Sequence, residues 1–167
     1  MKNQHSQKEG IKHQILSLFV YRFFHLCLVL ILTIIGLQYA DAGEHPSPCP
    51  QPRFTEQAPP EIYNLKNPLE STSENLKKGK FLFQVKAKPL PCKNCHGMTG
   101  DGNGPMARGF NPPPRNFTCT KTIKGVTDGQ LFWIIKNGSP GTGMLSYKGL
   151  KDEQIWQIIL HLRQLAQ

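Results

Sequence analysis

The sequence lacks any repeated unit, any run of heptads and any clear succession of alternating strands. These absences exclude repeat solenoids and long coiled coils, and they leave helices and loops to build the fold. Acidic residues are few, 11 against 20 Lys and Arg, so the chain of 167 residues carries a formal net charge of +9. Its basic residues form no stripe interleaved with aromatic side chains, and we therefore expect no nucleic-acid partner.

One dense apolar block lies near the N-terminus, where basic residues precede an almost unbroken apolar run over residues 26–37. The small residues Ala40 and Ala42 follow at the −3 and −1 positions of a cleavage site. This order is typical of a secretory signal peptide over residues 1–42, and cleavage is the favoured interpretation. The alternative is a retained membrane anchor, because residues 15–37 are long enough to span a bilayer.

Both interpretations place the rest of the chain in the periplasm or another extracytoplasmic compartment. After cleavage the protein would be soluble, and membrane contact is expected only if the N-terminal segment is retained. Residues 43–70 contain seven prolines, which cannot all lie inside helices or sheets, so this segment is predicted to be an arm or linker.

The remaining residues, 71–167, form the predicted domain. Three stretches have helical spacing of apolar residues, and the third is the clearest: 71–87, 128–137 and 152–165. Residues 89–114 are rich in Gly, Pro and Asn and are predicted to be loop. The fold class is therefore all-α with long irregular loops. Gly79 inside the first helix costs about 1 kcal/mol against Ala, which indicates that another helix crosses closely there.

Chemistry is concentrated in Cys92-Lys93-Asn94-Cys95-His96, a C-x-x-C-H motif for covalent attachment of c-type haem. The two thiols can form thioethers with the haem vinyl groups, and His96 can bind the iron from the proximal side. A thioredoxin-like redox pair is less favoured, because no βαβ pattern surrounds the motif. A zinc site lacks a second compact pair of ligands, and a plain disulfide of Cys92 with Cys95 is the weakest alternative.

A low-spin electron carrier needs a sixth iron ligand on the opposite face of the ring. Five residues downstream have suitable donor atoms: Met98, Met106, Cys119, Met144 and His161. Met144 is favoured because it stands in a glycine-flanked loop between two helices, and because Met with His is the usual ligand pair in cytochromes c. Cys119 and His161 remain alternatives, and so does Met106.

The stretch from about residue 64 to 165 resembles a small bacterial monohaem cytochrome of the class I cytochrome c family. The matching pieces occur in the family's order and cover almost the whole predicted domain. They are Gly79-Lys80-x-Leu82-Phe83, Cys92 to Gly97, Gly100-Asp101-Gly102-x-Gly104-Pro105, Pro112-Pro113-Pro114-Arg115-x-Phe117-Thr118, Gly138-x-x-Gly141-Thr142-Gly143-Met144 and Asp152-Glu153-x-Ile155-Trp156.

The resemblance implies a class I cytochrome c fold, with about three to five helices around one covalently bound haem c. It implies that the first and last helices cross, with Gly79 and Phe83 packing on the face of Ile158, His161 and Leu162. It also implies that a proline carbonyl accepts a hydrogen bond from the second ring nitrogen of the proximal histidine. We take Pro114 first for that role, with Pro112 and Pro113 as alternatives.

Two positions depart from the family pattern. The family usually has an aromatic residue near His161, so the packing of that helix crossing is expected to differ here. Leu145 stands where a proline often follows the methionine ligand, which leaves the ligand loop less rigid.

These features predict an electron carrier rather than an enzyme. The expected partners are redox proteins with acidic docking faces, because lysines flank both the haem motif and the methionine loop: Lys86, Lys88, Lys93, Lys148 and Lys151. Two alternatives are an electron-entry subunit of a larger oxidoreductase complex and a haem sensor of NO or CO. The sequence does not indicate an oligomeric state.

Cys49 and Cys119 are the remaining cysteines of the exported part. In an oxidising compartment they can form a disulfide that ties the arm to the haem domain.

Overall fold

The computed structural model describes residues 18–33, 49–51 and 55–167. The chain forms two compact units, residues 1–44 and 45–167. In the first unit, residues 18–33 are helical and almost entirely exposed. The predicted cleavage site and the basic residues that open the chain lie outside the described residues. Within those ranges, no helix combines the length and the apolar character needed to cross a membrane.

The second unit is all-α, as predicted, and its described residues include no strand. Three longer helices are joined by loops and short helical turns. The elements in chain order are α2 (Pro60–Tyr63), α3 (Ser73–Phe81), the π-helical turn η1 (Leu82–Lys86), α4 (Lys93–His96), α5 (Thr120–Ile123), α6 (Asp128–Asn137) and α7 (Asp152–Leu165).

The three longer helices confirm the helical stretches predicted from apolar spacing. α6 and α7 have the predicted bounds. The first helix begins at Ser73 rather than at the predicted residue 71. Thr72 caps it, because its side chain accepts a hydrogen bond from the N–H of Asn75. Beyond Phe81 the helix widens into η1 and ends at Ala87.

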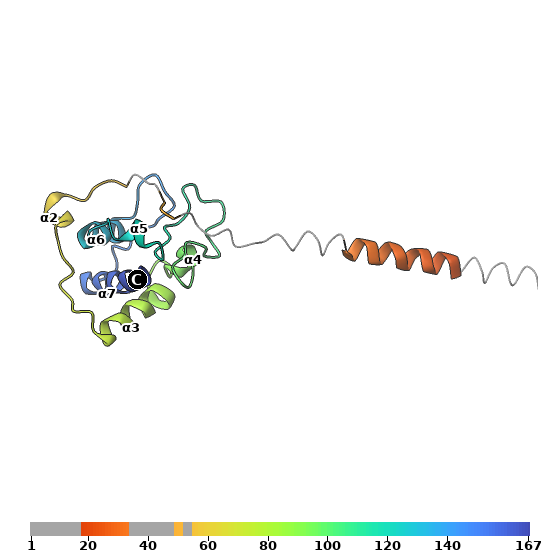
Figure 1. Ribbon diagram of the computed structural model, residues 1–167, viewed down its shortest axis with the longest axis horizontal. Coiled ribbons are helices and arrows are strands. Elements are labelled where there is room, and N and C mark those ends of the chain that lie inside the picture. The colour runs from red at the N-terminus through yellow and green to blue at the C-terminus, as the bar shows by residue number, and fades with distance from the viewer. Residues whose placement is uncertain (1–17, 34–48, 52–54) are drawn as a thin grey trace, which may run out of the picture. The chain divides into compact units, whose positions relative to one another are not determined.

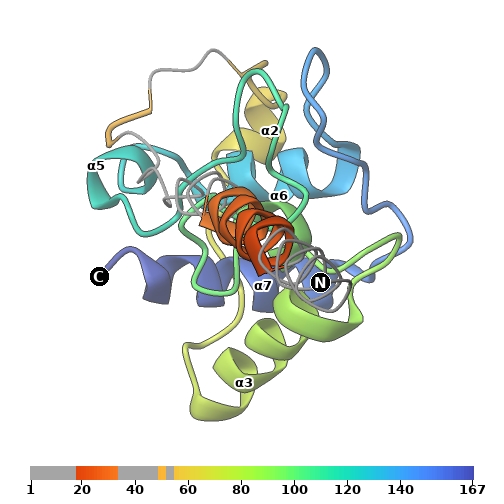
Figure 2. The ribbon, with the colours of Figure 1, turned by 90° about the vertical axis from the view of Figure 1, so that its right-hand side faces the viewer.

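The last helix forms the centre of the core. Both views show α7 between α3 and α6 (Figures 1 and 2). Ile155, Ile158, Ile159 and Leu162 are at most 2% exposed, and their spacing places them on one buried stripe of the helix. Burial of each such side chain stabilises the fold by about 1.5–3 kcal/mol.

The crossing of α3 and α7 is confirmed, and Gly79 lies at its closest point. A Cβ atom at Gly79 would collide with the backbone carbonyl of Gln157 in α7, so this position has room only for glycine. One turn further along, the fully buried Phe83 packs edge-on against His161, with ring centroids 5.3 Å apart. The imidazole thus takes the place of the aromatic residue expected there.

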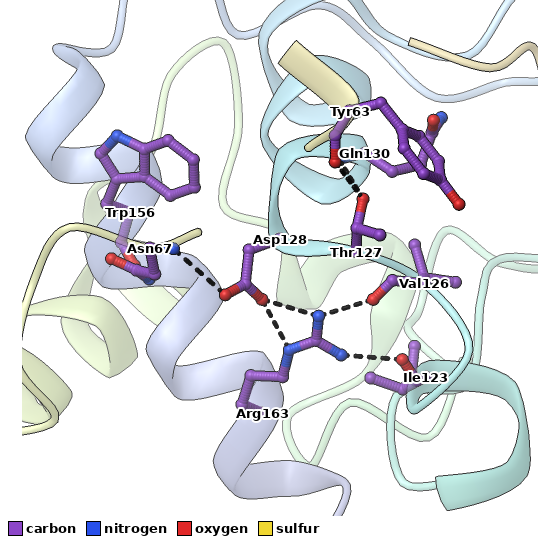
Figure 3. A network of polar contacts seen from close by, with 9 residues as sticks. All are labelled: Tyr63, Asn67, Ile123, Val126, Thr127, Asp128, Gln130, Trp156 and Arg163. Carbon is purple, nitrogen blue, oxygen red and sulfur yellow. Dashed lines mark hydrogen bonds and ion pairs between the residues drawn. The ribbon is translucent and has the colours of Figure 1, made fainter. Parts of the chain in front are cut away.

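Arg163 joins the C-terminal half of α7 to the start of α6 (Figure 3). Its guanidinium contacts Asp128 Oδ1 at 2.6 Å and donates to the carbonyls of Ile123 and Val126 at 2.7 and 2.6 Å. Since both partners of the ion pair are partly buried, the contact is shielded from salt more than a surface pair.

The described C-terminal part of the predicted arm, residues 55–70, contacts α6 over residues 56–67. The side chain of Gln130 accepts from the N–H of Ala58 and donates to the carbonyl of Glu56, both at 2.8 Å. Thr127 Oγ1 donates to the carbonyl of Tyr63 at 2.7 Å (Figure 3). The arm is therefore bound to the domain over this stretch, and it contains the short helix α2.

The expected disulfide between Cys49 and Cys119 is present, with a Cα–Cα distance of 5.6 Å. It links the arm to the residue that precedes α5. Cys119 is 3% exposed whereas Cys49 is exposed, so the bond ties the arm at the surface to a buried residue of the domain.

Candidate haem site

The cysteines and the histidine of the C-x-x-C-H motif line one cavity of about 350 Å³. The motif forms α4, a single helical turn in which Cys92 and Cys95 are three residues apart. Residues at this spacing lie on one face of a helix. The local fold therefore brings both sulfur atoms to the same side, next to His96.

The glycine-rich loop after the motif folds back over α4. Its N–H groups donate to carbonyls of the motif: Gly102 to His96 at 2.8 Å, Gly104 to Cys95 at 3.0 Å and Met106 to Asn94 at 2.7 Å. A Cβ atom at Gly104 would collide with the carbonyls of Lys93 and Asn94. Glycine here allows the loop to satisfy carbonyls that a short helix leaves without partners.

His96 is held in one orientation by two contacts. Its Nδ1 lies 2.9 Å from the carbonyl oxygen of Arg115, and since a carbonyl can only accept, Nδ1 carries the proton. The ring of Phe117 stacks on the imidazole with centroids 4.5 Å apart. These contacts fix the tautomer in which Nε2 is the nitrogen that can bind a metal.

The prediction of Pro114 as the partner of His96 is wrong. The carbonyl of Pro114 instead accepts from Gln51 Nε2 at 3.1 Å, and the next carbonyl, that of Arg115, faces the imidazole. A run of three prolines marks the segment in the sequence. Which carbonyl of the segment faces the histidine depends on the path of the loop, and the sequence does not show that path.

Two of the five candidate sixth ligands line the cavity. They are Met144, which is partly buried, and Met106, which is 47% exposed. Met106 lies in the loop that folds over α4, where its N–H donates to the carbonyl of Asn94. Met144 comes from the segment after α6, so its sulfur can approach from a different side of the cavity.

The other three candidates are not in the described cavity lining. Cys119 is bonded to Cys49, and His161 lies between α3 and α7 against Phe83. Met98 is 54% exposed. A thiolate from Cys119 is therefore not available to a metal in this structure.

The segment that carries Met144 is closed by its own hydrogen bonds. Thr142 Oγ1 accepts from the N–H of Met144 at 3.1 Å and donates to the carbonyl of Ser139 at 2.7 Å. The N–H of Ser139 returns to the carbonyl of Met144 at 3.3 Å. These bonds order the loop even though residue 145 is leucine, where the family often has proline. Leu145 itself is 47% exposed.

Tyr147 is a site residue that the sequence reasoning missed. It is 6% exposed, lines the cavity, and donates from its phenol to the carbonyl of Leu90 at 2.8 Å. Burial raises the pKa of Tyr147, so the phenol stays protonated and remains a donor. An aromatic residue soon after the methionine loop was the available signal.

The two motif cysteines are protonated thiols in this environment. Burial raises the pKa of Cys92 to about 12 and also raises that of Cys95. A thioether forms when a thiol adds across a vinyl double bond, with sulfur bonding to one carbon and hydrogen to the other. Such an addition requires reduced cysteines, and Cys92 and Cys95 form no disulfide.

The residues present fit a c-type haem. Two thiols and an oriented imidazole line the cavity together with a thioether, and most of the other lining residues are apolar. They include Phe83, Phe117, Ile123, Leu131, Ile135 and Ile158. Such walls suit a flat apolar macrocycle, and two thiols beside an imidazole are the donor set for covalent haem attachment.

A family model described as Cytochrome c matches residues 76–166. Among solved structures, the chain is similar to the Kuenenia stuttgartiensis reducing HAO-like protein complex, with 29% sequence identity and a TM-score of 0.51. That match covers 60% of this chain and 47% of the other, so this chain spans about half the length of the structure it matches. The search of curated proteins finds no match. The chain belongs to the class I cytochrome c family and is a haem-bearing electron-transfer protein.

Proposed function

We propose that this chain carries single electrons between redox proteins outside the cytoplasm, through one haem attached to Cys92 and Cys95. The observation that carries the proposal is that His96 and Met144 line the same apolar cavity as the two cysteines. The bound haem would supply a one-electron iron couple. His96 and Met144 are proposed as its axial ligands.

The surrounding residues favour fast electron transfer with little rearrangement. Arg115 and Phe117 hold the imidazole of His96 in place, and the bonds within residues 139–144 hold Met144. The apolar walls exclude water and disfavour additional charge. A neutral thioether ligand favours the ferrous state, so we expect the haem of this protein to have a positive midpoint potential.

An exposed apolar rim gives a redox partner access to the cavity. Met106, Phe110 and Leu145 line it and are 47%, 37% and 47% exposed. A Cβ atom at Gly143 would collide with the ring of Phe110. The rim therefore packs against the segment that carries Met144. Such a rim can contact a partner closely enough for electron transfer.

Exposed lysines support docking to acidic partners. Lys86 and Lys88 lie shortly before Cys92, and Lys148 and Lys151 lie shortly after Met144. Opposite charges speed the encounter of two proteins, and this effect falls as salt rises. We therefore propose weak, rapidly exchanging complexes with acidic redox proteins.

A signal peptide over residues 1–42 is part of this proposal, because c-type haem is attached outside the cytoplasm. The protein is then soluble in the periplasm or a comparable compartment after cleavage, with membrane anchoring as the alternative.

The second candidate function is that of an electron-entry subunit in a larger oxidoreductase complex. The similarity to a chain of a reducing HAO-like protein complex favours it. Size-exclusion chromatography of the protein purified from its own cells separates the two functions. A stable complex with an oxidoreductase would support the subunit function, and a free chain would support the mobile carrier.

The proposed function is tested on the purified holoprotein with a ferrous pyridine haem assay and an absorption spectrum. We expect one haem per chain, a low-spin spectrum and no spectral change when CO is added to the reduced protein. Rapid CO binding would indicate an open iron position and would contradict the electron carrier in favour of a gas sensor.

A further inference from the structure

Gln51 is a buried polar residue, 6% exposed, in the arm segment that the disulfide holds. Its side-chain amide accepts from the N–H of Asn116 at 2.7 Å and donates to the carbonyl of Pro114 at 3.1 Å. Its backbone carbonyl accepts from Arg115 Nη1 at 2.9 Å, and its N–H donates to Thr122 Oγ1 at 3.2 Å. Three of these four bonds go to residues 114–116.

Residues 114–116 are also the segment that contacts His96. The peptide unit between Arg115 and Asn116 has its C=O on His96 Nδ1 and its N–H on Gln51 Oε1. Because a peptide unit is planar, rotation at one end moves the other end. Gln51 therefore fixes the orientation of the acceptor that His96 uses.

Hydrogen bonding at the N–H also polarises the C=O of the same peptide unit. In a low-dielectric interior, consecutive hydrogen bonds strengthen one another, so the bond from Gln51 makes the Arg115 carbonyl a better acceptor. A stronger bond to Nδ1–H makes the imidazole of His96 a more basic ligand.

We propose that Gln51, anchored two residues away by the Cys49–Cys119 disulfide, is a positioning residue that sets the donor strength of His96. This role rests on the proposed ligation of the iron by His96. A more basic imidazole stabilises the ferric state, so Gln51 lowers the midpoint potential. Loss of its side-chain bonds raises that potential.

Gln130 provides a matched control. It is 5% exposed, and its side-chain amide also makes two hydrogen bonds to the arm, at Glu56 and Ala58. Within the described structure its side chain bonds to the arm and not to residues 114–116, and it does not line the cavity. Replacement of either glutamine by methionine removes two bonds at nearly constant side-chain volume.

The experiment compares wild type, Gln51→Met and Gln130→Met as exported ferrous holoproteins. NMR measures hydrogen exchange of His96 Nδ1–H, and redox titration measures the midpoint. We expect roughly tenfold faster exchange in Gln51→Met, which corresponds to about 1.4 kcal/mol and lies within what one hydrogen bond contributes, and less than about twofold in Gln130→Met. The midpoint should rise in Gln51→Met alone.

Equal exchange and equal midpoints in the two variants would overturn the proposal, because the effect would then be a general loosening of the arm. A Cys49→Ala, Cys119→Ala variant provides a second measurement if Gln51→Met does not fold. It should show faster Nδ1–H exchange and a higher midpoint than wild type, and wild-type values would overturn the role of the anchor. If wild type itself shows no histidine-ligated iron, the proposed function fails instead.

Discussion

The phenol of Tyr147 donates a 2.8 Å hydrogen bond to the carbonyl of Leu90. Tyr147 follows the Met144 loop, and Leu90 lies two residues before Cys92, so one bond joins the segments that carry the proposed distal and proximal parts of the site. Tyr147 also lines the cavity, which places this link directly beside the haem position.

Replacement of Tyr147 by Phe tests this link, because it removes the hydroxyl and keeps the ring. We expect a loss of about 1 kcal/mol in the free energy of unfolding, measured by guanidinium titration. We also expect slow CO binding to the reduced variant, since the Met144 segment is held less firmly. A variant with wild-type stability and no reaction with CO would show that the bond does not hold the loop closed.

Met144→Ala and Met106→Ala distinguish the two methionines that line the cavity. Loss of the thioether of Met144 should abolish the Met-to-iron near-infrared band, lower the midpoint potential and allow rapid CO binding, because the iron then has an open position. Met106→Ala should retain all three wild-type properties. The reverse pattern in the absorption spectra would assign the sixth ligand to Met106.

Gly79→Ala tests the crossing of α3 and α7. In an exposed helix this change would stabilise by about 1 kcal/mol, but here the added Cβ collides with the carbonyl of Gln157. We therefore expect a loss of about 2 kcal/mol or more, since overpacking moves the two helices apart.

Gly149→Ala is the control for that measurement. A Cβ atom at Gly149 meets no atom within 4 Å, so thermal unfolding should change by no more than about 0.5 kcal/mol. Equal effects of the two substitutions would contradict close contact at Gly79.

His161→Leu tests the cost of a buried imidazole. Burial lowers the pKa of His161, and this outweighs the opposite effect of its contact with Gln164. In the unfolded chain this imidazole binds a proton below about pH 6.5, whereas in the folded chain it binds one only at lower pH. The free energy of unfolding is therefore highest above about pH 6.5 and decreases as the pH falls. The Leu variant should lose less stability than wild type between about pH 7.5 and 5.5.

Chemical unfolding of both proteins at the two pH values provides that measurement. For each protein, the free energy of unfolding at the lower pH is compared with its value at the higher pH. Identical pH dependence in wild type and His161→Leu would show that the imidazole titrates normally in the folded protein.

The sequence predicts most of the elements because local pattern determines them. Asp128–Asn137 and Asp152–Leu165 have the predicted bounds, since helical spacing and end signals coincide there. The Gly79 crossing was also predictable, because a costly glycine inside a helix needs a compensating contact. The spacing of the C-x-x-C-H motif alone predicts that Cys92, Cys95 and His96 share one site. All three residues line the cavity.

What the sequence could not provide depends on contacts between distant segments. The partner of His96 is Arg115 rather than Pro114, and the carbonyl of Pro114 instead bonds to Gln51, more than sixty residues earlier in the chain. The link of Tyr147 to Leu90 is equally non-local. No spacing rule predicts such pairs, since they follow from tertiary packing.

The most direct test of the account is a spectroscopic redox titration of the purified holoprotein. Ligation by His96 and Met144 in an apolar cavity predicts one reversible one-electron transition with a positive midpoint potential. A strongly negative midpoint, or no reversible transition, would contradict the proposed ligand pair and with it the proposed electron carrier.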